Sequence, residues 1–235
     1  MTITKNLTEI TIRIEKAVKK HHRSSKSVQL LAVSKTWPPE KIRPLATAGQ
    51  QDFGENYLQE ALIKIQHLQD LNLTWHFIGP IQSNKTKDIA QNFDWVQSVD
   101  RPKIAQRLAT QRPMHLPPLN ICIQVNIDNE ASKSGINDSD LIPLAEHIHS
   151  LDNLLLRGLM IIPSKTDDIE QQRLSFRKAH TLFQRIASQY PSIDTLSMGM
   201  SNDMALAIAE GSTMVRIGSA LFGQRATPRP SGQVN

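Results

Sequence analysis

Leu30-Leu31-Ala32-Val33-Ser34-Lys35-Thr36 is the stretch from which the fold is predicted. Four consecutive apolar residues between polar neighbours are typical of a strand that is buried on both faces, as in a parallel sheet. Pro38 and Pro39 close the element, which places Lys35 at its carboxyl end. A desolvated lysine amine gives up its charge more readily and can then attack a carbonyl to form a Schiff base. On this stretch alone, a lysine that extends to solvent is the commoner outcome.

Strand and helix patterns alternate along the rest of the chain. Strands are expected at 28–34, 51–55, 73–78, 95–99, 119–127, 154–162, 195–198 and 214–217. Helices are expected at 6–22, with Asn6 as its cap, and at 40–48, 57–68, 85–91, 102–110, 138–151, 168–189 and 202–209. Seven of the eight expected strands are thus followed by a helix, and such an alternation calls for a parallel sheet.

This order of elements predicts a (β/α)8 TIM barrel with an extra N-terminal helix, because 235 residues is close to the usual size of that fold. An open doubly wound sheet is the main alternative. An open sheet of that kind is expected to have a glycine-rich nucleotide-binding loop after its first strand. Neither G-x-G-x-x-G nor a P-loop motif occurs in this sequence. We expect residues 1–225 to form a single domain. Residues 226–235 are expected to be a flexible C-terminal tail, because the composition turns to Pro, Gly, Arg and Gln after Gly223.

Composition and charge limit the classes of function. The single cysteine, Cys122, lies in an apolar run and is expected to be a buried, inert thiol. The start of the chain lacks the apolar core of a signal peptide, and no apolar run is long enough to cross a bilayer, so a cytoplasmic protein is expected. The formal net charge is +5, and no aromatic residues interleave the basic ones, so nucleic-acid binding is not expected. A solvated helix end explains the basic cluster of Lys16, Lys19, Lys20, Arg23 and Lys26.

In a TIM barrel the functional residues gather at the carboxyl ends of the strands, and phosphate commonly binds at the last two loops. Here those loops contain Gly199-Met200-Ser201-Asn202-Asp203 and Gly218-Ser219-Ala220. Their small residues let backbone N–H groups approach an anion, which predicts a phosphate site. The alternative is that one of the polar residues of the first loop only caps the helix that follows.

Two more candidates lie at strand ends. Arg216 interrupts the apolar strand 214–217 and must find a partner. That partner is either a ligand or a carboxylate, with Glu55 and Asp203 as possible mates. Asn56 follows the second strand, where it can hydrogen-bond a ligand or form a turn.

Other polar residues are assigned structural roles. His76 is expected to be a hydrogen-bonded core histidine, and Lys133 a solvated loop lysine that could reach over the barrel mouth. The remaining histidines have no metal-ligand spacing, so no metal site is expected.

Several motifs recur together with the order and spacing of one known family. They are Ala32-Val33-Ser34-Lys35, Phe53-Gly54-Glu55-Asn56-Tyr57, the segment 75–85 (WHFIGPIQSNK), Lys133-Ser134-Gly135, Arg157-Gly158-Leu159-Met160, the segment 196–201 (LSMGMS) and Val215-Arg216-Ile217-Gly218. Over about residues 8–224 the chain resembles the YggS/PROSC type of pyridoxal 5′-phosphate (PLP) homeostasis proteins. Each motif alone is weak, whereas the set is highly specific.

The resemblance implies an alanine racemase-like barrel (PLP fold type III) that binds PLP as an imine of Lys35. It further implies that Ser201, Gly218 and Ser219 bind the phosphate and that Arg216 faces the pyridine nitrogen. Asn56 and Met198 match residues that line the cofactor. The implied function is intracellular PLP homeostasis and cofactor supply without turnover, with PLP and apo-PLP enzymes as partners. No nucleic-acid or membrane partner is expected, and a lone barrel with no dimerising domain is expected to be a monomer.

A physical argument agrees with a carrier. An arginine beside the pyridine nitrogen disfavours its protonation, which weakens the ring as an electron sink. Two-base racemisation also needs a second acid–base group, and the chain has only Tyr57 and Tyr190 to supply a tyrosine. The alternatives that stay open are a PLP-dependent amino-acid racemase or lyase and a Schiff-base aldolase acting on a phosphorylated sugar.

Overall fold

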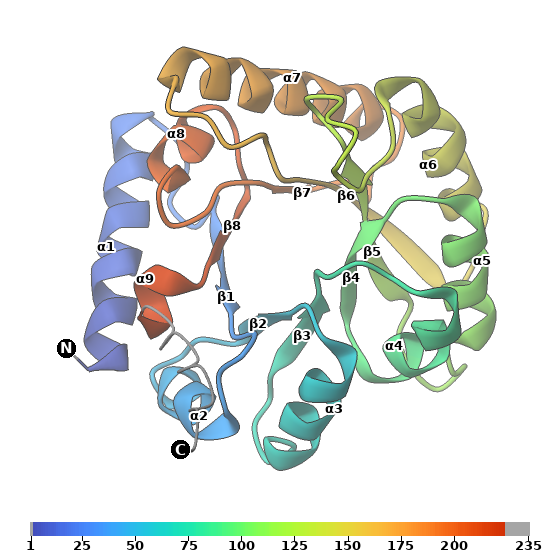
Figure 1. Ribbon diagram of the computed structural model, residues 1–235, viewed down its shortest axis with the longest axis horizontal. Coiled ribbons are helices and arrows are strands. Elements are labelled where there is room, and N and C mark those ends of the chain that lie inside the picture. Colours follow the sequence, from blue (N-terminus) through green and yellow to red (C-terminus); the bar gives the residue numbers. More distant parts are fainter. Residues whose placement is uncertain (1, 224–235) are drawn as a thin grey trace, which may run out of the picture.

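Eight parallel strands close into a barrel, which confirms the predicted (β/α)8 fold (Figure 1). The computed structural model describes residues 2–223, so the predicted tail at 226–235 lies outside the described residues. The strands are β1 (Gln29–Val33), β2 (Asp52–Glu55), β3 (Thr74–Phe77), β4 (Trp95–Val99), β5 (Leu119–Val125), β6 (Leu154–Ile161), β7 (Thr195–Ser197) and β8 (Met214–Ile217). Because β1 pairs with both β2 and β8, the first strand of the chain lies beside the last.

A helix follows each strand on the outside of the barrel. The α-helices are α1 (Ile3–Lys20), α2 (Pro39–Thr47), α3 (Leu58–His67), α4 (Thr86–Asn92), α5 (Pro102–Gln111), α6 (Leu141–His149), α7 (Ile169–Ala187), α8 (Met204–Ala209) and α9 (Ser219–Phe222). Single 3₁₀ turns at Ser83–Lys85 and Asp138–Asp140 precede α4 and α6. The prediction that no helix follows the eighth strand was wrong, since four residues of α9 are too few to produce a periodic pattern.

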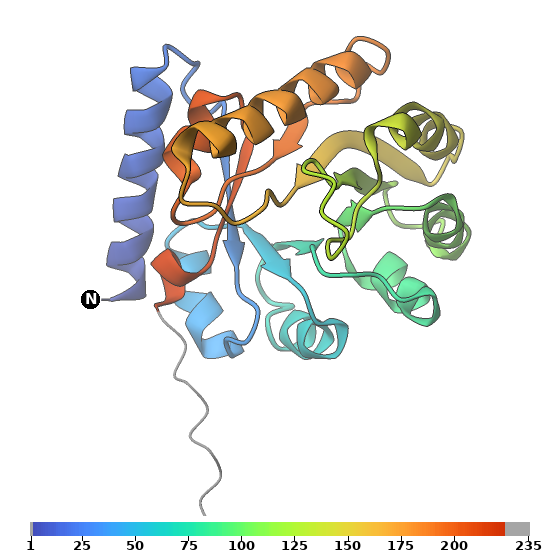
Figure 2. The same cartoon turned by 45° about the horizontal axis from the view of Figure 1, so that its top comes forward.

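The extra helix α1 lies along the outside of the barrel beside α8 and α9 (Figures 1 and 2). The predicted cap was wrong, because α1 begins at Ile3 and the amide of Asn6 lies inside it. That amide donates a hydrogen bond to the carbonyl of Leu221 at 2.8 Å and so ties α1 to α9. The buried face of α1 consists of Leu7, Ile10, Ile14, Ala17 and Val18.

The basic end of α1 is only partly solvated. Arg23 turns back onto the barrel, where its Nη1 donates to the carbonyls of Ile208 and Ser212 at 2.9 and 2.6 Å. These bonds cover the end of α8 and the approach to β8, so this arginine has a structural role. Among residues 2–223, no helix combines the length and the apolar character that a membrane span requires.

A β-bulge marks the pairing of β5 with β6. The register shifts so that Ile121 pairs with Leu156 and Cys122 with Gly158, which leaves Arg157 as the extra residue. Gly158 has φ +149°, and a Cβ there would lie 1.8 Å from the carbonyl oxygen of Thr195 in β7. Only glycine therefore fits. Cys122 has no exposed surface, and burial raises the pKa of its thiol, as expected for an inert cysteine.

Candidate functional site

A cavity of about 1130 Å³ opens at the carboxyl ends of the barrel strands. Its walls come from the loops after β1, β2, β3, β5, β6, β7 and β8. It brings together Lys35, Asn56, Ser201, Arg216, Gly218 and Ser219, six of the seven residues predicted for the site. The seventh, Met198, directly follows β7 and has no exposed surface, so it packs behind this wall and does not line it.

Lys35 is half-buried in the cavity wall, two residues after β1 ends. The next residue, Thr36, has φ +69°, an unusual conformation for a β-branched residue. The turn is closed by a hydrogen bond from the N–H of Trp37 to the carbonyl of Ser34 at 3.0 Å. Trp37 stacks on Phe222 of α9, with ring centroids 5.9 Å apart, so the loop after the first strand packs against the end of the barrel's last unit.

The predicted phosphate residues face Lys35 from the last two loops. The hydroxyl of Ser201 lies 3.2 Å from the hydroxyl of Ser219 and accepts a hydrogen bond from the N–H of Ala220 at 3.4 Å. Gly218 directly follows β8, beside Val33 of β1. The two loops are thus joined through small hydroxyl side chains. α8 begins at Met204, later than predicted, which leaves Ser201 in the preceding turn.

Arg216 is 5% exposed and lines the cavity floor. Its Nη1 donates to the carbonyl and the hydroxyl of Ser197 at 2.7 and 2.8 Å, and its Nη2 donates to the carbonyl of Ile161 at 2.7 Å. Burial lowers the pKa of its guanidinium to about 10. Among residues 2–223, no carboxylate forms a salt bridge with this arginine, so the alternative of a structural ion pair with Glu55 or Asp203 was wrong. The hydrogen-bond partners of Arg216 are neutral oxygens, and the charge of Asp203 opposes the lowering of its pKa without forming a salt bridge.

A chain of hydrogen bonds runs from Arg216 through the barrel interior. The Ser197 hydroxyl meets Oε1 of Gln97 at 2.7 Å, and Nε2 of Gln97 meets Nδ1 of His76 at 2.9 Å. Nε2 of His76 lies 3.0 Å from a carboxylate oxygen of Asp52. His76 is fully buried and also stacks on Trp95, which confirms a hydrogen-bonded core histidine. With Gln97 as donor to Nδ1, the proton of the neutral ring is placed on Nε2, facing Asp52.

Asn56 carries an unsatisfied acceptor. Its Oδ1 is buried without a hydrogen-bond partner among the described residues, and the residue lines the cavity. A buried amide oxygen of this kind is costly unless a ligand or water satisfies it. Gly79 lies against the same loop, where a Cβ would come within 2.2 Å of the carbonyl oxygen of Asn56. The backbone of Asn56 is therefore closely packed, while its side-chain oxygen has no partner among the described residues.

Lys133 does not stand free in solvent, contrary to the prediction. Its Nζ donates to the carbonyl of Pro163 at 2.8 Å and pairs with Glu130 at 3.1 Å, and its side chain is 25% exposed. Glu130 also accepts from the hydroxyls of Ser132 and Ser164 at 2.6 and 2.8 Å. These contacts lower the pKa of Glu130 to about 2. They join the loops after β5 and β6 into one wall of the cavity.

A buried ionic cluster under the Lys35 loop was not predicted. Lys64 of α3 is 2% exposed and lies between Glu55 of β2 and Glu60 of α3. Burial raises the pKa of Glu55, although the charge of Lys64 and the hydrogen bonds from Lys64 and the Ser34 hydroxyl act to lower it. The sequence held one signal: Lys64 falls three residues after Ala61, on the face of α3 that the barrel buries.

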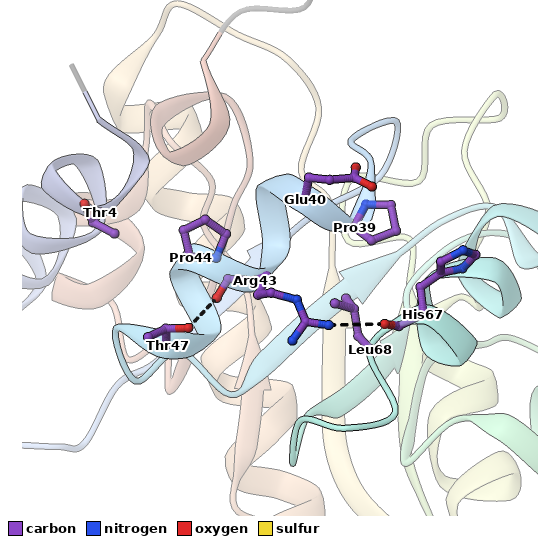
Figure 3. Close-up of a pocket in the computed structure, with 8 residues that line it drawn as sticks. All are labelled: Thr4, Pro39, Glu40, Arg43, Pro44, Thr47, His67 and Leu68. Carbon is purple, nitrogen blue, oxygen red and sulfur yellow. Dashed lines mark hydrogen bonds between the residues drawn. The ribbon is translucent and has the colours of Figure 1, made fainter.

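A second cavity, of about 600 Å³, lies apart from these residues between α1, α2 and α3 (Figure 3). There the guanidinium of Arg43 donates to the carbonyl of His67 at 3.3 Å, and Thr47 donates to the carbonyl of Arg43 at 3.0 Å. Arg43 also pairs with Asp70 at 2.5 Å. None of the predicted site residues lines this cavity, so it is not the candidate site.

The fold and the site at the strand ends are those of a known class of barrel. Residues 6–226 match the family described as "Alanine racemase, N-terminal domain". The chain is 54% identical over 228 residues to the pyridoxal phosphate homeostasis protein of Vibrio cholerae, with 95% of this chain and 97% of that protein covered. The chain belongs to this domain family and, within it, to the pyridoxal phosphate homeostasis proteins.

Solved structures agree. PipY of Synechococcus elongatus with PLP bound is 36% identical, with a TM-score of 0.81 and coverage of 94% of this chain and 100% of that chain. Alanine racemase from Corynebacterium glutamicum is 16% identical, with a TM-score of 0.66, and the match covers 99% of this chain and 62% of that chain. At that identity the second likeness concerns the fold alone.

Proposed function

We propose that this protein binds PLP in the cavity at the carboxyl ends of the strands and serves PLP homeostasis and cofactor supply. The single observation that carries the proposal is that Lys35 and the hydroxyls of Ser201 and Ser219 face one cavity from opposite ends of the chain. The names of the relatives and the PLP bound to PipY support it.

The residues present suit this cofactor. The aldehyde needs an amine, the phosphate needs N–H and hydroxyl donors, and a neutral pyridine nitrogen needs a donor. Lys35, the Ser201 and Ser219 pair, and Arg216 supply these in turn. The unsatisfied Oδ1 of Asn56 marks a polar atom that the protein alone does not pair. PLP supplies an aldehyde that condenses with an amine, with loss of water, to form a Schiff base.

Each residue then has a defined role. Lys35 holds the cofactor covalently through Nζ, and Gly218 lets the backbone approach the phosphate. Arg216 donates to the ring nitrogen and opposes its protonation, because a second positive charge beside a buried guanidinium is disfavoured. Asn56 orients the polar edge of the ring, and Met198 supports the cavity wall from behind.

We infer a carrier rather than a catalyst. An unprotonated pyridine is a poor electron sink, so the position of Arg216 disfavours carbanion chemistry. Neither tyrosine of the chain lines the cavity. Tyr57 is 54% exposed just after β2, and Tyr190 follows α7 and packs at a tilt against His149, with ring centroids 4.8 Å apart, near the opposite end of the barrel. A second acid–base tyrosine for racemisation is therefore missing from the cavity.

Release to apo-PLP enzymes belongs to the same proposal. The cavity opens to solvent at the end of the barrel, so an acceptor protein or water can reach Lys35. A monomeric state and a cytoplasmic location remain predictions from the sequence.

The test is spectroscopic. Purified protein incubated with PLP is expected to show the visible absorbance of a Schiff base, and borohydride followed by mass spectrometry should find the modification on Lys35. Lys35→Ala should lose the covalent product. A protein that stays colourless and unmodified after addition of PLP would overturn the proposal.

The alternatives are tested in parallel. A racemase or lyase would exchange the α-proton of amino acids at about 1 per second or faster, which we do not expect. A Schiff-base aldolase would be trapped by borohydride with a sugar phosphate in preference to PLP. Either result would replace the carrier assignment.

A further inference from the structure

The backbone on both sides of Lys35 is held from one helix. The carbonyl of Ser34 and the N–H of Thr36 belong to the two peptide groups that flank Lys35. The Ser34 carbonyl accepts a hydrogen bond from a side chain of α3, and the N–H of Thr36 donates one to another side chain of α3. Thr36 also has φ +69°, a conformation that persists only where surrounding contacts enforce it.

Lys64 supplies the first of these contacts. Its Nζ donates to the carbonyl of Ser34 at 2.8 Å, to Oε1 of Glu55 at 2.8 Å, and to Oε1 of Glu60. An ammonium group has three N–H donors, and all three are used. This buried lysine is therefore a structural cation, and its charge is matched by the carboxylates around it.

Glu60 supplies the second contact. Its Oε1 accepts the N–H of Thr36 at 2.5 Å and also the ammonium of Lys64. Glu55 completes the cluster by accepting the hydroxyl of Ser34 at 2.6 Å. The two peptide planes at the Cα of Lys35 are thus fixed, and with them the direction in which its side chain leaves the backbone.

We propose that Lys64 and Glu60 are positioning residues that aim Lys35 into the cavity for covalent capture of the cofactor. This inference rests on the proposed function. Nζ of Lys35 attacks the aldehyde carbon, a C=N bond forms, and the carbonyl oxygen leaves as water. Misorientation of the attacking amine slows such a step even where the bound aldehyde is unchanged.

The test measures total bound PLP and covalently attached PLP separately. Lys64→Met and Glu60→Ala are incubated with PLP, total bound cofactor is measured by equilibrium dialysis, and the rate of borohydride-trapped Lys35 is followed by mass spectrometry. We expect binding through the phosphate loops to persist and the rate of trapping to fall by about tenfold or more. Glu60→Gln keeps an oxygen for the N–H of Thr36 and should stay within about threefold of the parent protein.

Arg43→Ala is the matched control, because it breaks an exposed ion pair between α2 and Asp70 in the turn after α3. Far-UV circular dichroism without PLP checks folding, and if Lys64→Met does not fold, the half-exposed Glu60 carries the test. Equal trapping rates in Glu60→Ala and the parent protein would overturn the inference alone. Absence of trapping in the parent protein would overturn the proposed function.

Discussion

Arg216 is a buried charge that lines the cavity without a salt bridge among the described residues. A buried guanidinium is normally matched by a carboxylate, yet the hydrogen-bond partners of Arg216 are two carbonyls and one hydroxyl. Neutral oxygens hold the group in place without cancelling its charge. The remaining attraction is available to an electron-rich atom in the cavity, which is the property that the proposed pyridine contact requires.

Ser201 allows the phosphate assignment to be tested at one atom. Its hydroxyl lies between the loops after β7 and β8, 3.2 Å from the Ser219 hydroxyl. Ser201→Ala should weaken PLP binding by about tenfold, the loss typical of one hydrogen bond to a charged group. Equilibrium dialysis of the Lys35→Ala background measures this without covalent capture. Ser188→Ala, at the end of α7, is the control and should leave the affinity of the Lys35→Ala protein for PLP unchanged. If Ser201→Ala also left that affinity unchanged, Ser201 would not belong to the phosphate site.

At the scale of elements, the bulge in β6 depends on one glycine. Gly158→Ala would place a Cβ against the carbonyl of Thr195, so we expect a loss of about 2–4 kcal/mol in the free energy of unfolding. Gly49→Ala is the matched control, because φ is +98° but no atom lies within 4 Å of the new Cβ. It should cost about 1–2 kcal/mol. Urea unfolding measures both, and equal costs would contradict the steric argument.

The two loops joined by Glu130 should respond to acid. Hydrogen bonds from Ser132, Ser164 and Lys133 lower the pKa of Glu130 from its ordinary 4.5 to about 2. A carboxylate with a depressed pKa contributes stability that is present above the unfolded pKa and is lost as the pH falls toward the folded one. The gap in unfolding free energy between the parent and Glu130→Ala should therefore be largest above about pH 4.5 and shrink toward pH 2.

Urea titrations across that range, with Ser164→Ala as a partial variant, measure the effect. Ser164→Ala removes one of the donors to Glu130 and should show a smaller gap with the same direction of pH dependence. A gap that does not change with pH would show that the loops are not joined through the ionised carboxylate.

Periodic elements were predictable and their tertiary partners were not. β4 and β8 begin and end as predicted because apolar runs define buried strands. Lys35, Ser201 and Arg216 could be placed in one site because a parallel barrel gathers the carboxyl ends of its strands. Other contacts join residues that are distant in sequence. Examples are the hydrogen bond from Lys64 to the Ser34 carbonyl and the one from Asn6 of α1 to the Leu221 carbonyl of α9. No local pattern reports such pairs.

At the scale of the whole molecule, α1 supports the closure of the barrel. It packs against α2 near the start of the chain and against α8 and α9 near its end. Ile10→Ala removes a side chain that is 2% exposed and should cost about 2–4 kcal/mol. Because the helix contacts both ends of the chain, the loss should appear as one cooperative shift rather than as local fraying.

Urea unfolding followed by near- and far-UV circular dichroism checks this. Ile12→Ala is the matched control on the same helix, since Ile12 is 43% exposed and its truncation should cost less than about 1 kcal/mol. Transitions that separate between the two probes in Ile10→Ala would show that α1 unfolds independently.

The pairing of β1 with β8 has a consequence for synthesis. The loop that carries Lys35 leaves the ribosome early, but Ser201 and Ser219 emerge 166 and 184 residues later, ~10–40 s behind it at ordinary elongation rates. A nascent polypeptide therefore has no complete pocket until its final strand docks beside its first. Only a chain that includes its last strand can form the cavity for PLP. A message truncated before codon 214 would yield a product that cannot retain the cofactor.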